Sequence, residues 1–142
     1  MTETRTCPEC GAAWTSGVTC EEMFHQVLVW EAEDADLLSE HFLTVACYNL
    51  QHPAMFQDSA IENLKGGLVL RIDQNAQVPE LRRRAAAAYN GPQRVLKPVP
   101  ERKSVLQEWH MTIAEVYANG EPLGAADRVR AWGKSTREDL RP

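Results

Sequence analysis

Three cysteines near the start of the chain have the spacing of metal ligands. Cys7 and Cys10 form a Cys-x-x-Cys turn that is followed by Gly11, and Cys20 comes ten residues after the second cysteine. Such a turn lets two thiolates meet one ion, because the backbone folds back on itself. Zinc in a structural site takes four nitrogen or sulfur ligands in a tetrahedron. A fourth ligand must therefore come from elsewhere in the chain.

The candidates for the fourth ligand are one further cysteine and the histidines: Cys47, His25, His41, His52 and His110. The helices that the sequence predicts separate them. A capping box, Thr19-x-x-Glu22, predicts a helix that starts at this point. A second helix, expected from about 37 to 50, would run antiparallel to the first after a turn near residues 34–35.

In this hairpin the start of the first helix, with Cys20, lies beside the end of the second, where His52 falls. His41 would lie roughly 16 Å back along the second helix, and His25 is about 140° around the first helix from Cys20. Cys47 belongs to an apolar helix face, where a buried and inert thiol is usual. We therefore predict a zinc knuckle with four ligands, closed and structural rather than catalytic: Cys7, Cys10, Cys20 and His52.

A second group of polar side chains could carry chemistry of its own. His41 and Tyr48 share one face of the second helix, and we expect His25 opposite them. Two histidines and a tyrosine could bind a second metal or act as general acid and base. More often such groups hydrogen-bond across a helix interface.

Two functions of different class therefore stay open. The first is a non-enzymatic interaction or regulatory module that contains structural Zn²⁺. The second is a metal-dependent enzyme that acts on a small molecule or a thiol, through an open zinc position or through the group His25, His41 and Tyr48.

Composition places only broad limits on function. The chain has 142 residues, 44% of them hydrophobic and 25% charged, which is typical of a globular protein. No apolar signal segment opens the chain, and no apolar run approaches the roughly 18 residues that cross a bilayer. We expect a cytoplasmic protein without a membrane partner. In that compartment four cysteines favour metal or redox chemistry over structural disulfides, and no βαβ pattern supports a redox turn.

Charge is distributed unevenly along the chain. Residues 1–64 carry one arginine against eleven acidic residues, a net charge of −10, whereas residues 65–142 carry fourteen basic and nine acidic residues, a net charge of +5. This asymmetry could guide self-association into a homodimer or attract an anionic ligand. Nucleic-acid binding is not expected, because the basic residues are not interleaved with aromatic ones and no recognised motif is present.

Helical patterns continue through the rest of the chain. A helix is expected at 59–72, opened by a capping box at Ser59. Gly66-Gly67 inside it indicates either close packing against a neighbour or a break of the helix, with a short strand at 68–72. Further helices are expected at 79–89, at 105–117 and at 122–134. A box at Thr112-x-x-Glu115 could instead start a shorter fifth helix, and residues 91–103, with three prolines, should be extended. The sequence predicts one all-α domain over 1–142, a bundle of five or six helices in which the zinc-knuckle segment 1–20 packs on the hairpin 20–52.

The segment His41–Pro53 resembles part of an uncharacterised bacterial family of small helical proteins. That family opens with Cys-x-x-Cys-Gly and carries the pattern Leu-Thr-Val-x-x-Tyr-x-x-Gln-His-Pro, which is present here from Leu43 to Pro53. The closing Val129-x-x-Trp132 is similar as well. Because the family is a domain of unknown function, the resemblance implies no activity. It does imply a role for His52, which belongs to the pattern.

Overall fold

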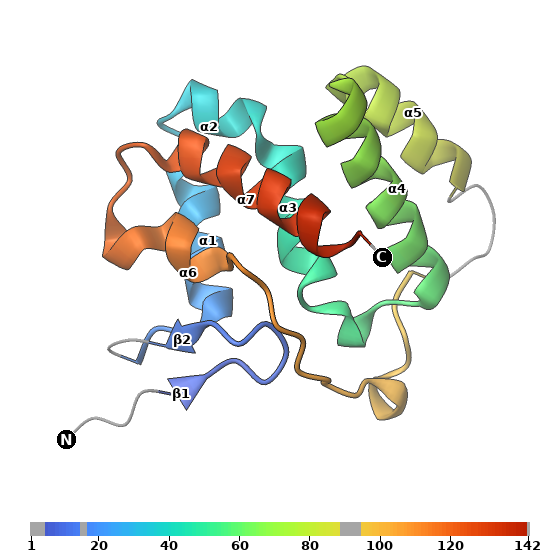
Figure 1. Cartoon of the computed structure of the whole chain (residues 1–142), viewed down its shortest axis with the longest axis horizontal. Helices are drawn as coiled ribbons and strands as arrows, with labels where there is room; N and C mark the ends of the chain where they lie inside the picture. Colours follow the sequence, from blue (N-terminus) through green and yellow to red (C-terminus); the bar gives the residue numbers. More distant parts are fainter. Residues whose placement is uncertain (1–4, 15–16, 89–94, 142) are drawn as a thin grey trace.

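A computed structural model describes residues 5–14, 17–88 and 95–141 of the chain. Within these ranges the chain forms seven α-helices and one two-stranded sheet (Figure 1), so the predicted all-α class is confirmed. Strands β1 (Arg5–Thr6) and β2 (Ala13–Trp14) pair antiparallel and enclose the cysteine turn. No helix in the described part of the chain combines the length and the apolar character that a membrane crossing requires.

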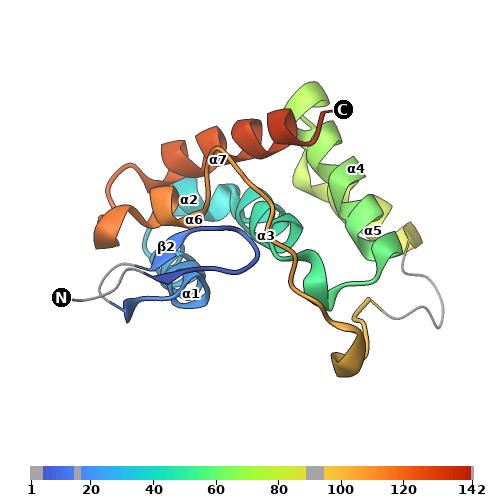
Figure 2. The same cartoon turned by 60° about the horizontal axis from the view of Figure 1, so that its bottom comes forward.

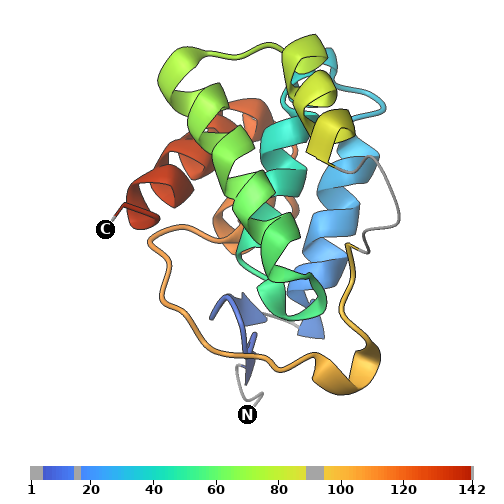
Figure 3. The ribbon, with the colours of Figure 1, turned by 90° about the vertical axis from the view of Figure 1, so that its right-hand side faces the viewer.

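In chain order the helices are α1 (Cys20–Trp30), α2 (Ala35–Ser39), α3 (His41–Leu50), α4 (Asp58–Gln74), α5 (Val78–Ala88), α6 (Ile113–Tyr117) and α7 (Ala125–Asp139). Helix α7 packs against four of the other helices, α2, α3, α4 and α6. α3 contacts α4 and α7, whereas α6 packs against α1 and α7 (Figure 2). α5 packs on α4 at the side of the molecule that faces the viewer in Figure 3.

The second predicted helix is divided in two. α2 and α3 are separated at Glu40, where φ is −102° and ψ is 16°, so the expectation of one continuous helix from 37 to 50 is wrong. The Asp34 side chain caps α2 by accepting from the Leu37 amide at 3.0 Å. At the break the Glu40 carboxylate is buried and accepts from Arg71 of α4 at 3.1 Å. This contact between distant segments accompanies the local departure from helical geometry.

The predicted side-chain caps give the start of α1 correctly but not the start of α4. α1 begins where expected, since the Thr19 hydroxyl accepts from the amide of Glu22 at 3.2 Å. α4 begins at Asp58 and has no side-chain cap. The capping box expected at Ser59 is therefore wrong, although the helix itself forms.

Only a short helix forms in the fifth predicted segment. The box at Thr112 is present, and the Glu115 carboxylate accepts from the Thr112 amide at 2.9 Å. The helix that follows is Ile113–Tyr117, which confirms the shorter of the two alternatives. The expected end of the fourth helix at residue 89 and the stretch 91–94 lie outside the described residues.

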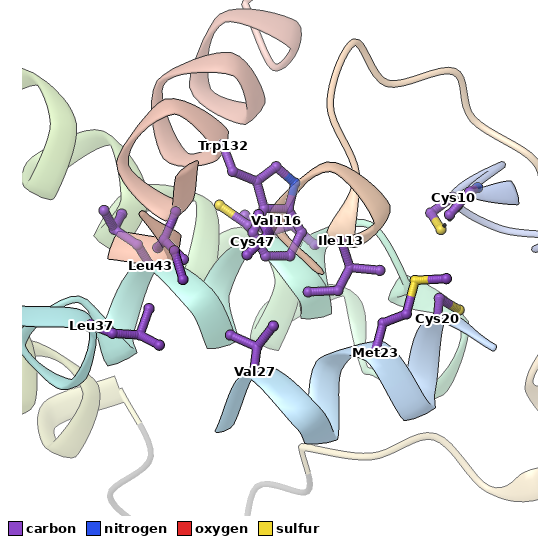
Figure 4. Close-up of a cluster of buried hydrophobic side chains, with 14 of the residues drawn as sticks. Cys10, Cys20, Met23, Val27, Leu37, Leu43, Cys47, Ile113, Val116 and Trp132 are labelled. Carbon is purple, nitrogen blue, oxygen red and sulfur yellow. Dashed lines mark hydrogen bonds between the residues drawn. The ribbon is translucent and has the colours of Figure 1, made fainter. Parts of the chain in front are cut away.

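The apolar core lies between α1, α3, α6 and α7 (Figure 4). Its largest fully buried side chain is Trp132, and Met23, Leu37, Leu68 and Ile113 are also buried almost completely. Each such side chain stabilises the fold by roughly 1.5–3 kcal/mol relative to an exposed position. The core is thus large enough to hold the helices together.

Some acidic side chains of the first half of the chain form ion pairs with basic side chains of the second half. Arg130 of α7 pairs with Asp36 of α2 and lies 3.7 Å from Glu40, and Lys97 lies 3.6 Å from Asp58. These pairs join the acidic first half of the chain to the basic second half. They account for some of the opposite charge without a partner molecule.

Two glycines allow close contacts between helices. A Cβ atom on Gly67 would lie 3.1 Å from the Phe42 ring, which agrees with the close packing expected at Gly66-Gly67. In α7 a Cβ atom on Gly133 would lie 3.1 Å from Leu43 and 3.2 Å from Ile72. α3, α4 and α7 therefore meet at a position where only glycine fits without displacement.

We expect Gly133→Ala to destabilise the protein. Alanine favours the helix by about 1 kcal/mol, but overpacking typically costs about 1–3 kcal/mol, and the neighbouring Leu43 and Ile72 atoms leave no space on two sides. Urea unfolding followed by circular dichroism measures the change. Gly66→Ala is the control, since it meets only the flexible end of Arg84 and should cost less. Equal or greater stability of Gly133→Ala would contradict this account.

Candidate metal centre

The structure brings the four predicted ligand side chains to one place. The ligand atoms of Cys7, Cys10, Cys20 and His52 all lie within 4.8 Å of one another. None of the four residues is more than 9% exposed. No other group of three or more His, Cys, Asp or Glu side chains in the described residues is arranged to hold an ion. The cluster could therefore hold a metal ion.

Backbone hydrogen bonds between residues close in sequence form the cysteine turn. The Cys7 amide donates to the Ala12 carbonyl at 2.9 Å, and the Gly11 amide donates to the Cys7 carbonyl at 3.0 Å. Gly11 has φ +77°, a conformation that glycine adopts without strain. Two amides also point at sulfur, from Glu9 to Cys7 and from Ala12 to Cys10, both at 3.4 Å. Such donors favour the thiolate form.

The third sulfur lies at the start of a helix. Cys20 is the first residue of α1, directly after the Thr19 cap. The amino-terminal end of a helix carries a partial positive charge, which stabilises a thiolate. Figure 4 shows Cys10 and Cys20 together at one end of the core, with Met23 beside them.

The imidazole is positioned by the end of α3. Pro53 disfavours helical geometry in the preceding residue, and His52 accordingly has φ −131° and ψ 61°. Gln51 is almost completely buried, and its side chain donates to the Met111 carbonyl at 2.9 Å and to the Thr136 hydroxyl at 3.3 Å. The helix end is therefore fixed to the rest of the fold on one side while the histidine is turned toward the cysteines on the other.

A backbone carbonyl selects the ring nitrogen that faces the sulfurs. The His52 Nδ1 atom lies 2.7 Å from the Tyr48 carbonyl oxygen. Because a carbonyl can only accept, Nδ1 carries a proton. Nε2 then faces the cysteines, 3.6 Å from the Cys7 sulfur and 3.4 Å from the Cys20 sulfur. This is the arrangement by which proteins usually orient a metal-binding histidine.

These separations fit a tetrahedral ion. With zinc–sulfur bonds of about 2.3 Å and a zinc–nitrogen bond of about 2.0–2.1 Å, tetrahedral angles place sulfur and nitrogen about 3.5 Å apart. The observed values for His52 Nε2 are 3.4 and 3.6 Å. The separations of His52 Nε2 from the Cys7 and Cys20 sulfurs are therefore those that a tetrahedral first-row divalent ion requires.

The pKa shifts of the clustered side chains show how they share protons in the absence of a cation. A hydrogen bond from Cys10 lowers the pKa of Cys20, and the same bond, together with burial, raises the pKa of Cys10. Burial opposes the charging of His52, but contacts with Cys20 and with the Tyr48 carbonyl raise its pKa overall. The cluster thus carries protons that an incoming cation would have to displace.

An aromatic stack covers one side of the cluster. The Tyr48 ring lies parallel to Phe24 of α1 with ring centroids 4.0 Å apart, and its other neighbour is the His52 ring at 4.2 Å. Burial raises the pKa of Tyr48, so its hydroxyl stays neutral. The stack joins α1 to α3 at the cluster.

The other predicted histidine group is not assembled. His41 lies two turns before Tyr48, about 10 Å along the helix, and its Nδ1 atom bonds Glu31 at 2.8 Å. Tyr48 belongs to the stack at the cysteine cluster, and His25 lies beside Phe24 with ring centroids 5.9 Å apart. These residues have separate structural partners.

The remaining candidates also have structural surroundings. His110 is exposed and bonds Asp139 at 2.6 Å. Cys47 is completely buried in the core, and burial raises the pKa of its thiol to about 12. This agrees with the inert thiol that its helix face predicts.

The sequence did not predict that the Tyr48 carbonyl orients the His52 ring, nor that Glu9 in the cysteine turn bonds segments far along the chain. The spacing of four between Tyr48 and His52 was available as a signal, because a carbonyl at position i can reach a side chain at i+4 at a helix end. Glu9 had no such signal. Its partners lie far along the chain, at Ala54 and Gln107.

Residues 5–141 match a family of unknown function, DUF5946. The chain belongs to this family. No curated protein and no solved structure matches the chain. The geometry of the site therefore carries the functional argument alone.

We expect uptake of a divalent metal ion to release protons. Cys10 has a raised pKa and is protonated in the metal-free protein at neutral pH, and His52 also has a raised pKa. The Cys10 thiol must lose its proton to bind an ion, and His52 can bind through Nε2 only when that nitrogen carries no proton, so affinity should fall as the pH falls. Calorimetric zinc titrations in buffers of different ionisation enthalpy measure the release. A heat that does not depend on the buffer would contradict this expectation.

Proposed function

We propose that this protein binds one Zn²⁺ ion through Cys7, Cys10, Cys20 and His52, and that the ion is structural. The chain then acts as an interaction or regulatory module and not as an enzyme. The observation that supports this proposal best is the closed set of four side chains, whose sulfur–nitrogen separations of 3.4 and 3.6 Å suit tetrahedral zinc.

The choice of zinc rests on the chemistry of the donors. Three thiolates and one imidazole are a standard set for structural zinc. Magnesium and calcium take oxygen ligands, and none is offered here by the four clustered side chains. Four cysteines would suit an iron–sulfur cluster, but Cys47 lies in the core and takes no part in the group.

A structural role for the ion is supported by the segments of the chain that the ion would connect. Its ligands come from the β1–β2 turn, from the first residue of α1 and from the second residue after the end of α3. Two strands of two residues each have little stability of their own. Zinc would thus attach a weak hairpin to two helix ends, and four protein ligands leave no position for substrate.

A pocket beside the cluster favours a second candidate. It has a volume of about 430 Å³, and its lining includes Cys7, Cys20 and His52. A thiol or another small molecule that entered there could reach the ion if one protein ligand left it. The second candidate is therefore a metal-dependent enzyme whose zinc ion has an open position.

X-ray absorption at the zinc edge tests both candidates. A structural site gives three sulfurs at about 2.3 Å and one nitrogen at about 2.0 Å, and the spectrum should not change when a small thiol is added. In His52→Ala the nitrogen should be lost. An oxygen ligand in the unmodified protein, or a fourth sulfur after the thiol is added, would instead support the enzyme.

We expect Cys10→Ser to lose stoichiometric zinc and to keep most of the helical circular dichroism. The reason is that most of the apolar core, including the buried Trp132 and Met23, lies between the helices, and the turn adds only Cys7, Cys10 and Ala12 to it. Elemental analysis gives the metal content, and Cys47→Ser is the matched control that should keep the ion. Complete unfolding of Cys10→Ser would show that the ion holds the whole fold.

A further inference from the structure

Residues 102–109, called the strap from here on, cross the molecule without forming a helix or a strand. In Figures 1 and 3 the strap, in orange, runs beside the β1–β2 turn. Connections in compact domains have a median length of roughly 4–6 residues, so this segment is a longer connection than usual. The strap is therefore an element whose position needs a cause.

Glu9, between the two cysteines of the turn, bonds the strap. Its carbonyl accepts from the Gln107 amide at 3.0 Å, and its Oε1 atom accepts from the Ser104 hydroxyl at 3.4 Å. Its Oε2 atom accepts from the Ala54 amide at 3.1 Å. One residue of the turn thus holds both the strap and the segment that follows His52.

The strap has few other attachments. Among the described residues, the only strap amides that donate to a backbone carbonyl are those of Arg102 and Gln107, and the first of these bonds is to Val99 in the preceding turn. Val105 is 73% exposed and Leu106 is 62% exposed. Only Trp109, at the far end, packs against the core. The middle of the strap is therefore held mainly by the cysteine turn.

The strap forms a wall of two pockets. Arg102 and Ser104 line the pocket of about 430 Å³ that opens on Cys7 and His52. The strap from 106 to 109 lines a second pocket, of about 680 Å³, on the side of Cys10. Both pockets need the strap in its present position.

We propose that metal binding fixes the strap through Glu9 and so completes the two pockets. This inference rests on the proposed zinc site. Cys7 and Cys10 flank Glu9, and an ion bound to both holds the Glu9 backbone and carboxylate in place for Ser104, Gln107 and Ala54. When the ion leaves, the turn loses this constraint and the strap loses its main attachment. The metal state of the cluster thereby controls a surface that lies outside the cluster.

Hydrogen exchange with mass spectrometry on the full chain tests the proposal. We expect the Gln107 amide, which donates to the Glu9 carbonyl, to exchange at least tenfold faster after zinc is removed with a chelator, because few other contacts hold the middle of the strap. Amides in α4 and α7 should change less than twofold. Elemental analysis of each sample shows whether one zinc ion is bound.

Variants separate the strap from the ion. Glu9→Ala should still bind one zinc ion, yet its loaded form should show several-fold faster strap exchange. Glu9→Gln keeps an oxygen for the Ala54 amide and should restore much of the protection. Ser104→Ala leaves the turn intact and should also speed strap exchange if Glu9→Ala fails to fold. Glu62→Ala, on the exposed face of α4 where it bonds Lys65, is the matched control and should change nothing.

Three results would overturn the inference in distinguishable ways. Equal strap exchange with and without bound zinc overturns it and leaves the zinc site standing. Loss of protection in all helices on chelation also overturns it, because the ion would then stabilise the whole fold. A chain that binds no zinc overturns both this inference and the proposed function.

Discussion

Three sulfur atoms and one imidazole are enclosed in one space, which they can share either with their protons or with a cation. Their ligand atoms lie within 4.8 Å of one another and are nearly inaccessible to solvent. Without a cation the cysteines can ionise only in part, because like charges repel each other and burial favours the neutral forms. A divalent ion removes both penalties. On the proposal of a zinc site, the position of the β1–β2 turn, and of the segments bonded to it, depends on this balance.

The Gln51-His52-Pro53 motif shows how three adjacent residues serve that balance. The proline ends α3, the glutamine fastens the helix end to Met111 and Thr136, and the histidine turns toward the sulfurs. Tyr48, one turn earlier, supplies the carbonyl that fixes the imidazole tautomer. The helix end is thus specified by local backbone chemistry and by contacts with the core together.

Features that depend on nearby residues could be predicted from the sequence, whereas features that depend on distant residues could not. Placing His52 beside Cys20 needed only helix rise and a turn near residue 34, which are local quantities. The break at Glu40 could not be predicted in this way, because its carboxylate bonds Arg71, which is 31 residues away. Likewise, the apolar pattern from 105 to 111 resembles a helix, yet the strap follows the cysteine turn in an extended form. Local preference yields where a distant partner offers a better contact.

The two ends of α3 make different kinds of contact with the rest of the fold. At its start, the Glu40 carboxylate joins α4 and α7 through Arg71 and Arg130. At its end, His52 reaches the cysteines, and between them Leu43 and Cys47 fill the core. The helices are held together by apolar burial and by the charge pairs at the start of α3, and the same core cluster also includes Cys7, Cys10 and Cys20. On the proposal of a zinc site, a change of metal state acts first on the strap, whose Val105 and Leu106 side chains are exposed, and last on the core between the helices.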